Sequence, residues 1–171
     1  GAGFANFSHL VPFSHPLGLI VVTLVFNGSA DLLSTQVNLS TITIRSTTVM
    51  IVDPIAANPV AGTSFNVSGQ VLSDNGSGLE QRDGSVLPSN ILFSINGQPV
   101  GFTVTGGTVT AGGIWNASIL LSETFEAANN SLEASYVPSV NFYIGSVSNT
   151  SFDSRGFSTL VFVKPSLDGL G

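Results

Sequence analysis

The chain has no cysteine, and charged side chains are scarce. Only 8% of its 171 residues are charged, about a third of the roughly 25% found in ordinary soluble domains. Without cysteine there is no disulfide framework and no thiolate site, so stability must come from burial, hydrogen bonding or association. Something other than side-chain charge must also keep the surface hydrated.

Basic residues and long apolar runs are lacking as well. Lysine and arginine together number 4, and the net charge is −6, which leaves no basic patch for phosphates and excludes nucleic acid as a partner. The longest apolar run, residues 17–26, is far shorter than the ~20 residues of a membrane helix, so no membrane span is expected. High hydrophobicity with low charge excludes a disordered chain and favours a single packed domain.

The residues that are abundant are those of turns and short strands. No segment sustains a helical period, although residues 122–130 would tolerate one short helical turn. Asn96-Gly97 predicts a type I′ hairpin between residues 91–95 and 102–104. Many short strands with frequent turns are typical of an all-β sandwich. Strands are predicted at 17–26, 36–44, 47–52, 64–72, 90–96, 100–105, 114–121, 131–137 and 157–164, with weaker ones near 107–110 and 141–146.

Glycosylation triplets are over-represented. Thirteen asparagines are present, and eight of them begin an Asn-x-Ser triplet, where about three would arise by chance from the serine and threonine content. A glycan must face solvent on an exported protein, and it would supply the hydration that the sparse charges do not. N-linked glycans are therefore expected at Asn6, Asn27, Asn38, Asn66, Asn75, Asn116, Asn129 and Asn149.

Strand alternation agrees with two of these sites. In residues 64–72 the inward set is Phe65, Val67 and Val71, which turns Asn66 outward. In residues 115–121 the inward set begins at Trp115, which turns Asn116 outward. Trp115 and Tyr136 are interpreted as core anchors, each needing one polar contact.

The first fifteen residues read as an extended strand with one apolar face. Such a segment cannot bury its rings alone, so it either folds back as the first strand of its own domain or completes the sheet of a neighbouring copy. Pro12 and Pro16 mark a hinge and favour the second option, whose head-to-tail product is a filament. The donor residues would be Ala5, Phe7, Val11 and Phe13, with His9 on the same face.

From residue 46 onward the chain resembles the immunoglobulin-like repeats of archaeal and bacterial cell-surface proteins. The combination of tail, body and dense triplets is also similar to the glycosylated archaeal thread-type pilus subunits. The resemblance implies an immunoglobulin-like β-sandwich and assembly of identical subunits by donor-strand complementation outside the cell. The segments that carry it are 47–52, 61–69, 95–101, 112–117, 131–136 and 141–146.

No catalytic residue, metal site or cofactor is predicted. His9 and His15 lie in the tail without a neighbouring carboxylate, and the acidic residues are scattered rather than paired. The loop 74–78 has oxygen ligands for Ca²⁺ but lacks the later glutamate of an EF-hand, so an ordinary turn is favoured. Lys164, the only lysine, is interpreted as a charge that protects an edge strand from unwanted pairing. A covalent bond between Lys164 and an asparagine is the alternative.

These observations predict a donor-strand tail at 1–15, a sandwich at 16–165 with a core repeat at 46–165, and a short C-terminal tail at 166–171. We expect an extracellular, non-enzymatic filament subunit whose partners are identical copies, with contacts to surfaces or other cells. The alternative is a monomeric adhesin, stalk or surface-layer module that binds a target.

Overall fold

The computed structural model describes residues 6, 8–12, 14–56, 58–79, 89–110, 112–139 and 142–156. These residues form eleven strands, and the all-β class is confirmed. No helix suited to crossing a membrane occurs among them. The strand predicted at 157–164 lies outside the described residues.

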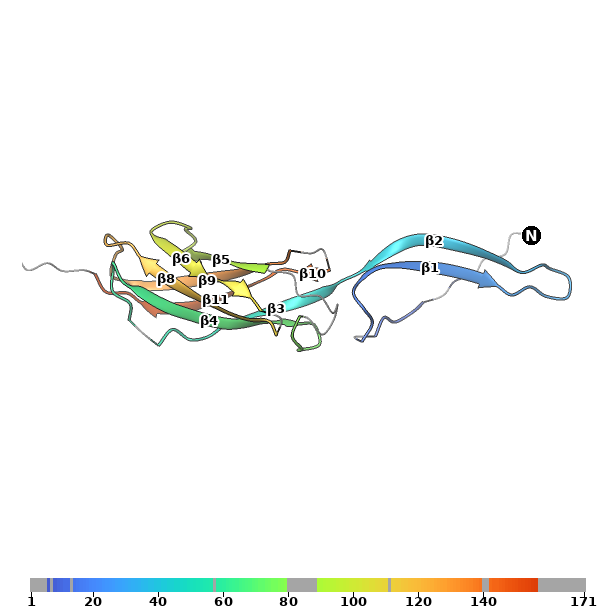
Figure 1. The fold of residues 1–171 in the computed structure, drawn as a ribbon, viewed down its shortest axis with the longest axis horizontal. Coiled ribbons are helices and arrows are strands. Elements are labelled where there is room, and N and C mark those ends of the chain that lie inside the picture. Colours follow the sequence, from blue (N-terminus) through green and yellow to red (C-terminus); the bar gives the residue numbers. More distant parts are fainter. Residues whose placement is uncertain are drawn as a thin grey trace, which may run out of the picture.

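Nine of the strands form a two-layer sandwich (Figure 1). One sheet has the order β10-β3-β4-β8-β6 and the other the order β11-β9-β5-β7. The first contains β3 (Ser46–Val52), β4 (Ser64–Ser73), β6 (Phe102–Gly106), β8 (Ile114–Leu121) and β10 (Tyr143–Ile144). The second contains β5 (Ser89–Ile95), β7 (Thr108–Val109), β9 (Asn129–Val137) and β11 (Ser146–Asp153).

The core lies between the sheets and follows the predicted alternation. Every second residue of β4 and β8 is buried, while Asn66 and Asn116 are exposed. Trp115 and Tyr136 are buried as expected. Trp115 stands edge-on to Phe93 at a centroid distance of 5.8 Å. Its indole nitrogen has no hydrogen-bond partner among the described residues, so the expected polar contact is not found there.

The Asn96-Gly97 turn was predicted correctly, whereas the hairpin expected beyond it is wrong. Both turn residues have positive φ, 53° and 75°, and Ile95 and Gln98 exchange backbone hydrogen bonds of 2.9 Å. The chain then leaves β5 and pairs with β8 as β6, in the opposite sheet. It returns as β7 through Gly106 and Gly107, both at positive φ.

Two further loop predictions can be compared with the structure. The segment 122–130 forms no helix, only a turn closed by the Phe125 N–H and the Ser122 carbonyl, before β9 begins. Nearly all of β11 was missed, because the weak strand expected at 141–146 reaches only its first residue, Ser146.

The two N-terminal strands do not join the sandwich. β1 (Gly18–Phe26) and β2 (Thr35–Ile44) pair only with each other, antiparallel, in a sheet of their own. The predicted sandwich began at residue 16, and the structure instead extends this hairpin from one end of the body along its long axis (Figure 1). At about 3.3 Å per residue its nine-residue strand spans roughly 30 Å. We call this hairpin the arm.

The base of the arm is attached to the body at two places. β2 continues into β3 across Arg45 alone, and Leu17 packs against the core. Gly18, at φ +118°, leaves room for the ring of Phe142, which would contact a Cβ atom at 3.5 Å. The arm is therefore joined to the sandwich by continuous strand and by a small apolar contact.

Candidate functional site

Among the described side chains, one face of the arm is aliphatic and aromatic apart from Gly18 and Thr35. β1 runs without interruption, whereas the register with β2 shifts by one residue between Val21 and Thr23. The extra residue on β2 is a β-bulge, which keeps apolar side chains of both strands on one side despite their unequal spacing. We call this side the apolar face; it comprises Ile20, Val22, Leu24, Phe26, Val37, Leu39, Ile42 and Ile44.

Much of the apolar face is accessible to solvent. Val37 is 55% exposed and Ile42 47% exposed, and Leu24, Phe26 and Leu39 are also exposed. An isolated two-stranded hairpin is at best marginally stable in water, and a contiguous exposed apolar patch indicates an interaction site. The arm thus requires a second layer over this face.

The opposite face of the arm mixes polar and apolar groups. Asn38 lies on this side, where its side-chain oxygen accepts a 2.8 Å hydrogen bond from the Thr23 hydroxyl across the hairpin. Leu19, Val21 and Val25 are exposed beside them. A glycan on Asn38 would therefore project away from the apolar face.

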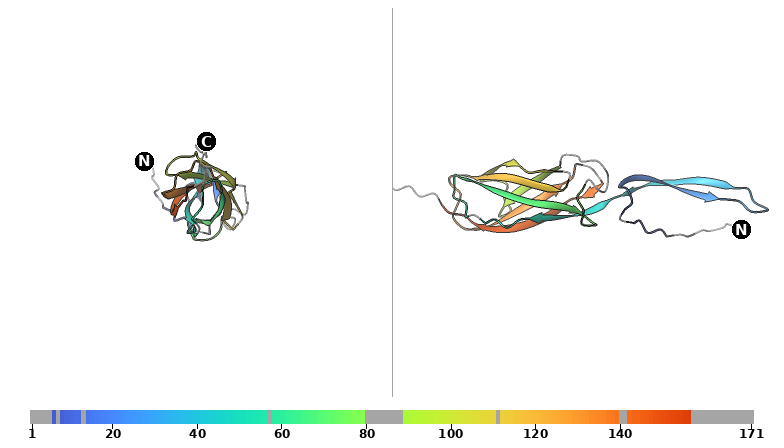
Figure 2. Two further views of the ribbon diagram at one scale, coloured as in Figure 1. Left: turned by 90° about the vertical axis from the view of Figure 1, so that its left-hand side faces the viewer. Right: turned by 60° about the horizontal axis from the view of Figure 1, so that its bottom comes forward.

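The tail runs alongside the arm and pairs with no strand over its described residues (Figure 2). Leu10 is 90% exposed, and His9 and Val11 line a hollow of about 480 Å³ against five residues of the apolar face. A gap of this size is foreign to close-packed protein layers. Of the predicted donor residues, Val11 is described, while Ala5, Phe7 and Phe13 lie outside the described residues.

All eight triplet asparagines are exposed. Asn66 and Asn116 lie on the outer face of the five-stranded sheet, and Asn129 and Asn149 on the outer face of the four-stranded sheet. Asn6 is in the tail, Asn27 in the loop at the tip of the arm, and Asn75 in the turn after β4. Solvent access, which glycosylation requires, is thus available at every site.

No group of three or more histidine, aspartate or glutamate residues placed to hold a metal ion occurs in the part of the chain that the structure describes. In the loop 74–78 the side-chain oxygen of Asn75 accepts hydrogen bonds from the Ser73 hydroxyl at 2.6 Å, from the Ser77 N–H at 3.0 Å and from the Ser77 hydroxyl. These bonds close an ordinary turn. His15 contacts the Pro16 carbonyl at 2.8 Å. Lys164 lies outside the described residues.

The apolar face was missed at the sequence level, although a signal for it exists. The segments 17–26 and 36–44 were both predicted as strands of the sandwich. Both strands carry apolar residues at alternate positions, but the bulge near Leu39 breaks the alternation in β2. Which elements remain without a partner depends on long-range pairing, which alternation alone does not encode.

Neither a protein-family model nor a curated protein matches the sequence. Among solved structures, domains 4 and 5 of the S-layer protein SbsC give a TM-score of 0.42 at 7% identity, covering 80% of this chain and 67% of that chain. A structure of SbsC domains 1–6 gives the same values, with 84% of this chain and 17% of that chain covered. The ZirS C-terminal domain gives a TM-score of 0.36 at 13% identity, covering 91% and 85%. Similarities at this level do not assign the chain to a family or to a function.

Proposed function

We propose that the chain is a structural subunit of an extracellular filament, in which the N-terminal tail and arm of one copy bind the body of the next. The observation that carries the proposal is the exposed apolar face of the arm. A second copy is a suitable partner because every copy exposes the same apolar face. In a chain of copies, each subunit except the terminal one would have this face covered by its neighbour.

Burial of the apolar face would supply a useful free energy. Five of its residues, Leu24, Phe26, Val37, Leu39 and Ile42, are exposed by between 36% and 55%. If complete burial of such a side chain yields about 1.5–3 kcal/mol, covering the remaining surface of the five yields roughly 3–7 kcal/mol before ordering costs. Ladder hydrogen bonds made by the tail would add to this.

The placement of the elements favours an open chain of subunits. The arm extends from one end of the sandwich, and β11, the last described strand, runs toward the other end (Figure 1). A contact between the arm of one copy and the body of the next joins two different surfaces. Repetition of such a heterologous contact without rotational closure generates a filament.

An extracellular location and N-glycosylation complete the proposal. Eight exposed triplets on a chain with few charges supply acceptor sites for the sugars that would hydrate a fibre. Catalysis and a cofactor play no part in this function, which rests on binding between identical chains.

Electron microscopy of purified protein, with its mass in solution, tests the proposal. The full chain should form fibres or concentration-dependent multimers, and a chain lacking residues 1–44 should stay monomeric with an intact sandwich, reported by fluorescence of Trp115. A full chain that remains monomeric at high concentration, with its glycans both present and removed, would contradict it.

A further inference from the structure

One side of the sandwich is open to its core. The seam lies between β6 of one sheet and β5 of the other, where the chain crosses between the layers at Gly106 and Gly107. Phe102 and Val104 face the core, because they pair with the buried residues Leu121 and Ile119 of β8. Nevertheless Val104 is 38% exposed, so the layer that should cover it is missing among the described residues.

The other side of the sandwich is closed, which gives an internal comparison. There, Met50 of β3 faces the core near the opposite edge and is only 6% exposed. β10 and β11 belong to different sheets and follow each other across this side, and the Thr48 hydroxyl donates to the Ser146 hydroxyl at 2.8 Å between the two layers. The two edges of the same sandwich therefore differ in how far their core residues are covered.

Strand β6, on one side of the seam, has backbone groups that pair with no strand among the described residues. Gly101 accepts a hydrogen bond from Ser122, and the Gly107 N–H donates to Asn116, so the odd-numbered residues of this segment point toward β8. In an antiparallel pair the alternate residues, Phe102, Val104 and Gly106, then direct their N–H and C=O groups away from the sheet. β6 is the last strand of its sheet in the described structure, and these groups form an unpaired edge.

The seam lacks the features that protect the edges of sheets. Residues 84–122 contain no charged side chain, and neither β5 nor β6 carries a proline or a glycosylation triplet. Native edges are usually guarded by charges, prolines or cover. Residues 1–30, which include the tail and β1, also contain no charged side chain, so joining the two segments buries no unpaired charge.

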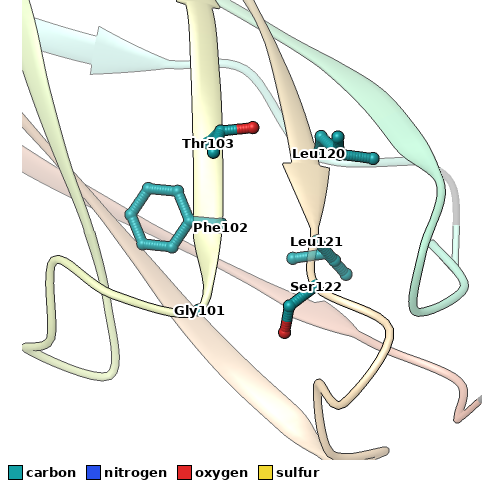
Figure 3. Close-up of a pocket in the computed structure, with 6 residues that line it drawn as sticks. All are labelled: Gly101, Phe102, Thr103, Leu120, Leu121 and Ser122. Carbon is teal, nitrogen blue, oxygen red and sulfur yellow. The ribbon is translucent and has the colours of Figure 1, made fainter.

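A hollow opens at the end of the seam farthest from the arm. It has a volume of about 250 Å³ and is lined by Gly101, Phe102, Thr103, Leu120, Leu121 and Ser122 (Figure 3). A second hollow of about 350 Å³ shares Gly101 and Ser122 and extends over Phe125 and Val100. The seam thus ends in mostly apolar space that could accept large side chains.

We infer that the seam is the acceptor for the N-terminal tail of a second copy, whose strand would extend the five-stranded sheet beyond β6. This inference rests on the proposed filament function and identifies the surface of the body that takes part. Tail residues on the face of Val11 would cover Val104 and Phe102. Asn6, on the other face of the strand, would remain in solvent with its sugar.

The occupant is a second copy because of where the tail lies. The described tail residues lie along the arm (Figure 2), at the end of the molecule opposite to the mouth of the seam. Its contact with its own arm leaves the hollow of about 480 Å³ described above, so it is poorly packed there. The described part of the tail is thus without a charged residue and without a strand partner, like the seam.

The absence of cysteine permits a cross-linking test with introduced thiols. We would prepare the full chain with Leu10→Cys and Thr103→Cys, two exposed positions, the second on β6. The control carries Leu10→Cys and Val49→Cys, with Val49 exposed on β3 at the closed edge. A short bis-maleimide should cross-link the first protein into a ladder of multimers. The same reagent should give no ladder with the control protein.

Four other outcomes would overturn the inference, and they separate it from the proposed function. If fibres form but the cross-linked ladder appears only with the Val49→Cys control, or with neither protein, the proposed filament stands and the seam is rejected as the acceptor. Absence of any multimer, including fibres of the unmodified chain, would reject both. A concentration-independent cross-link within one monomer would show that the tail reaches its own seam. A fourth measurement uses a variant with the single substitution Val104→Cys. If its thiol is protected from the maleimide in the monomer, and removal of residues 157–171 makes it reactive, the seam is filled by the C-terminal segment of the same chain.

Discussion

Gly69 of β4 lies directly opposite Trp115 of β8, and a Cβ atom on Gly69 would lie 2.5 Å from Cζ2 of the indole ring. The same atom would collide with the carbonyl oxygen of Ile51 on the neighbouring strand. Trp115 is the largest fully buried side chain, and its position requires a residue without a side chain at 69.

Gly69→Ala should therefore destabilise the sandwich. Overpacking typically costs about 1–3 kcal/mol of unfolding free energy, and contact with both backbone and a buried ring places this variant at the upper end; denaturant titration of Trp115 fluorescence measures it. Gly112→Ala is the matched control, because a Cβ there would meet nothing within 4 Å. Equal stability of the two variants would contradict the packing described for Trp115.

Charge on the apolar face of the arm should abolish assembly without unfolding the body. Ile42→Asp places a carboxylate on this face, where burial against a partner would cost several kcal/mol. Thr41→Asp places the same charge on the opposite face of the same strand. Fibre formation should be lost for Ile42→Asp and retained for Thr41→Asp, with both monomers showing the denaturation midpoint of the unmodified chain. Loss of assembly in both variants would mean that assembly does not depend on which face of the arm carries the charge, and would contradict the role of the apolar face.

Local alternation and turn chemistry predicted much of the sandwich. The inward sets of β4 and β8, the burial of Tyr136 and the turn at Asn96-Gly97 each depend on a few neighbouring residues, and each was correct. β11 was missed because Ser148 and Thr150 occupy its half-buried positions, and small polar residues there remove the apolar signal.

The arm and the seam could not be derived in the same way. Whether β1 and β2 join the sandwich depends on which strands occupy its edges. The passage from β6 in one sheet to β7 in the other depends on Gly106 and Gly107, both at positive φ. Such pairings are long-range, and alternation is the same for a strand in a sandwich and a strand in an isolated hairpin. Of the predicted donor residues, Val11 is described and the other three lie outside the described residues, and the donor role of all four stays a prediction.

Adjacent asparagines in β9 should respond differently to substitution. Asn130 is 3% exposed; its amide donates to the Ala128 carbonyl at 2.8 Å and to the Ser154 hydroxyl at 2.9 Å, and its oxygen accepts from Asn96 at 2.8 Å. Asn130→Ala leaves buried partners unsatisfied, and we expect a loss of about 2–4 kcal/mol. Asn129→Ala removes one exposed hydrogen bond to Asp153 and should cost about 1 kcal/mol or less. Thermal unfolding of the unglycosylated variants measures both, and the reverse order would contradict the network.

The eight exposed triplets should carry glycans in protein purified from its natural host. Peptide mass spectrometry should find sugar on Asn66 and Asn116, and substitution of either by Gln should change the unfolding free energy of unglycosylated protein by no more than about 0.5 kcal/mol, as for other exposed positions. Asn75→Gln should cost more, because Asn75 closes its turn with three hydrogen bonds. Unmodified asparagine at all eight positions would remove glycosylation from the proposal.

Assembly should be nearly insensitive to sodium chloride. The tail and the seam belong to stretches without charged residues, so their association contains no ion pair for salt to screen. Raising the concentration from about 0.1 M to about 1 M shortens the Debye length from roughly 10 Å to roughly 3 Å and should leave the multimer fraction, measured by sedimentation velocity, unchanged. Sulfate should instead increase that fraction, because it strengthens the burial of apolar surface. Dissociation by sodium chloride over this range would mean that charged residues elsewhere on the body hold the subunits together. The contact between subunits would then lie near Asp53, Asp153 and Arg155 rather than along β6.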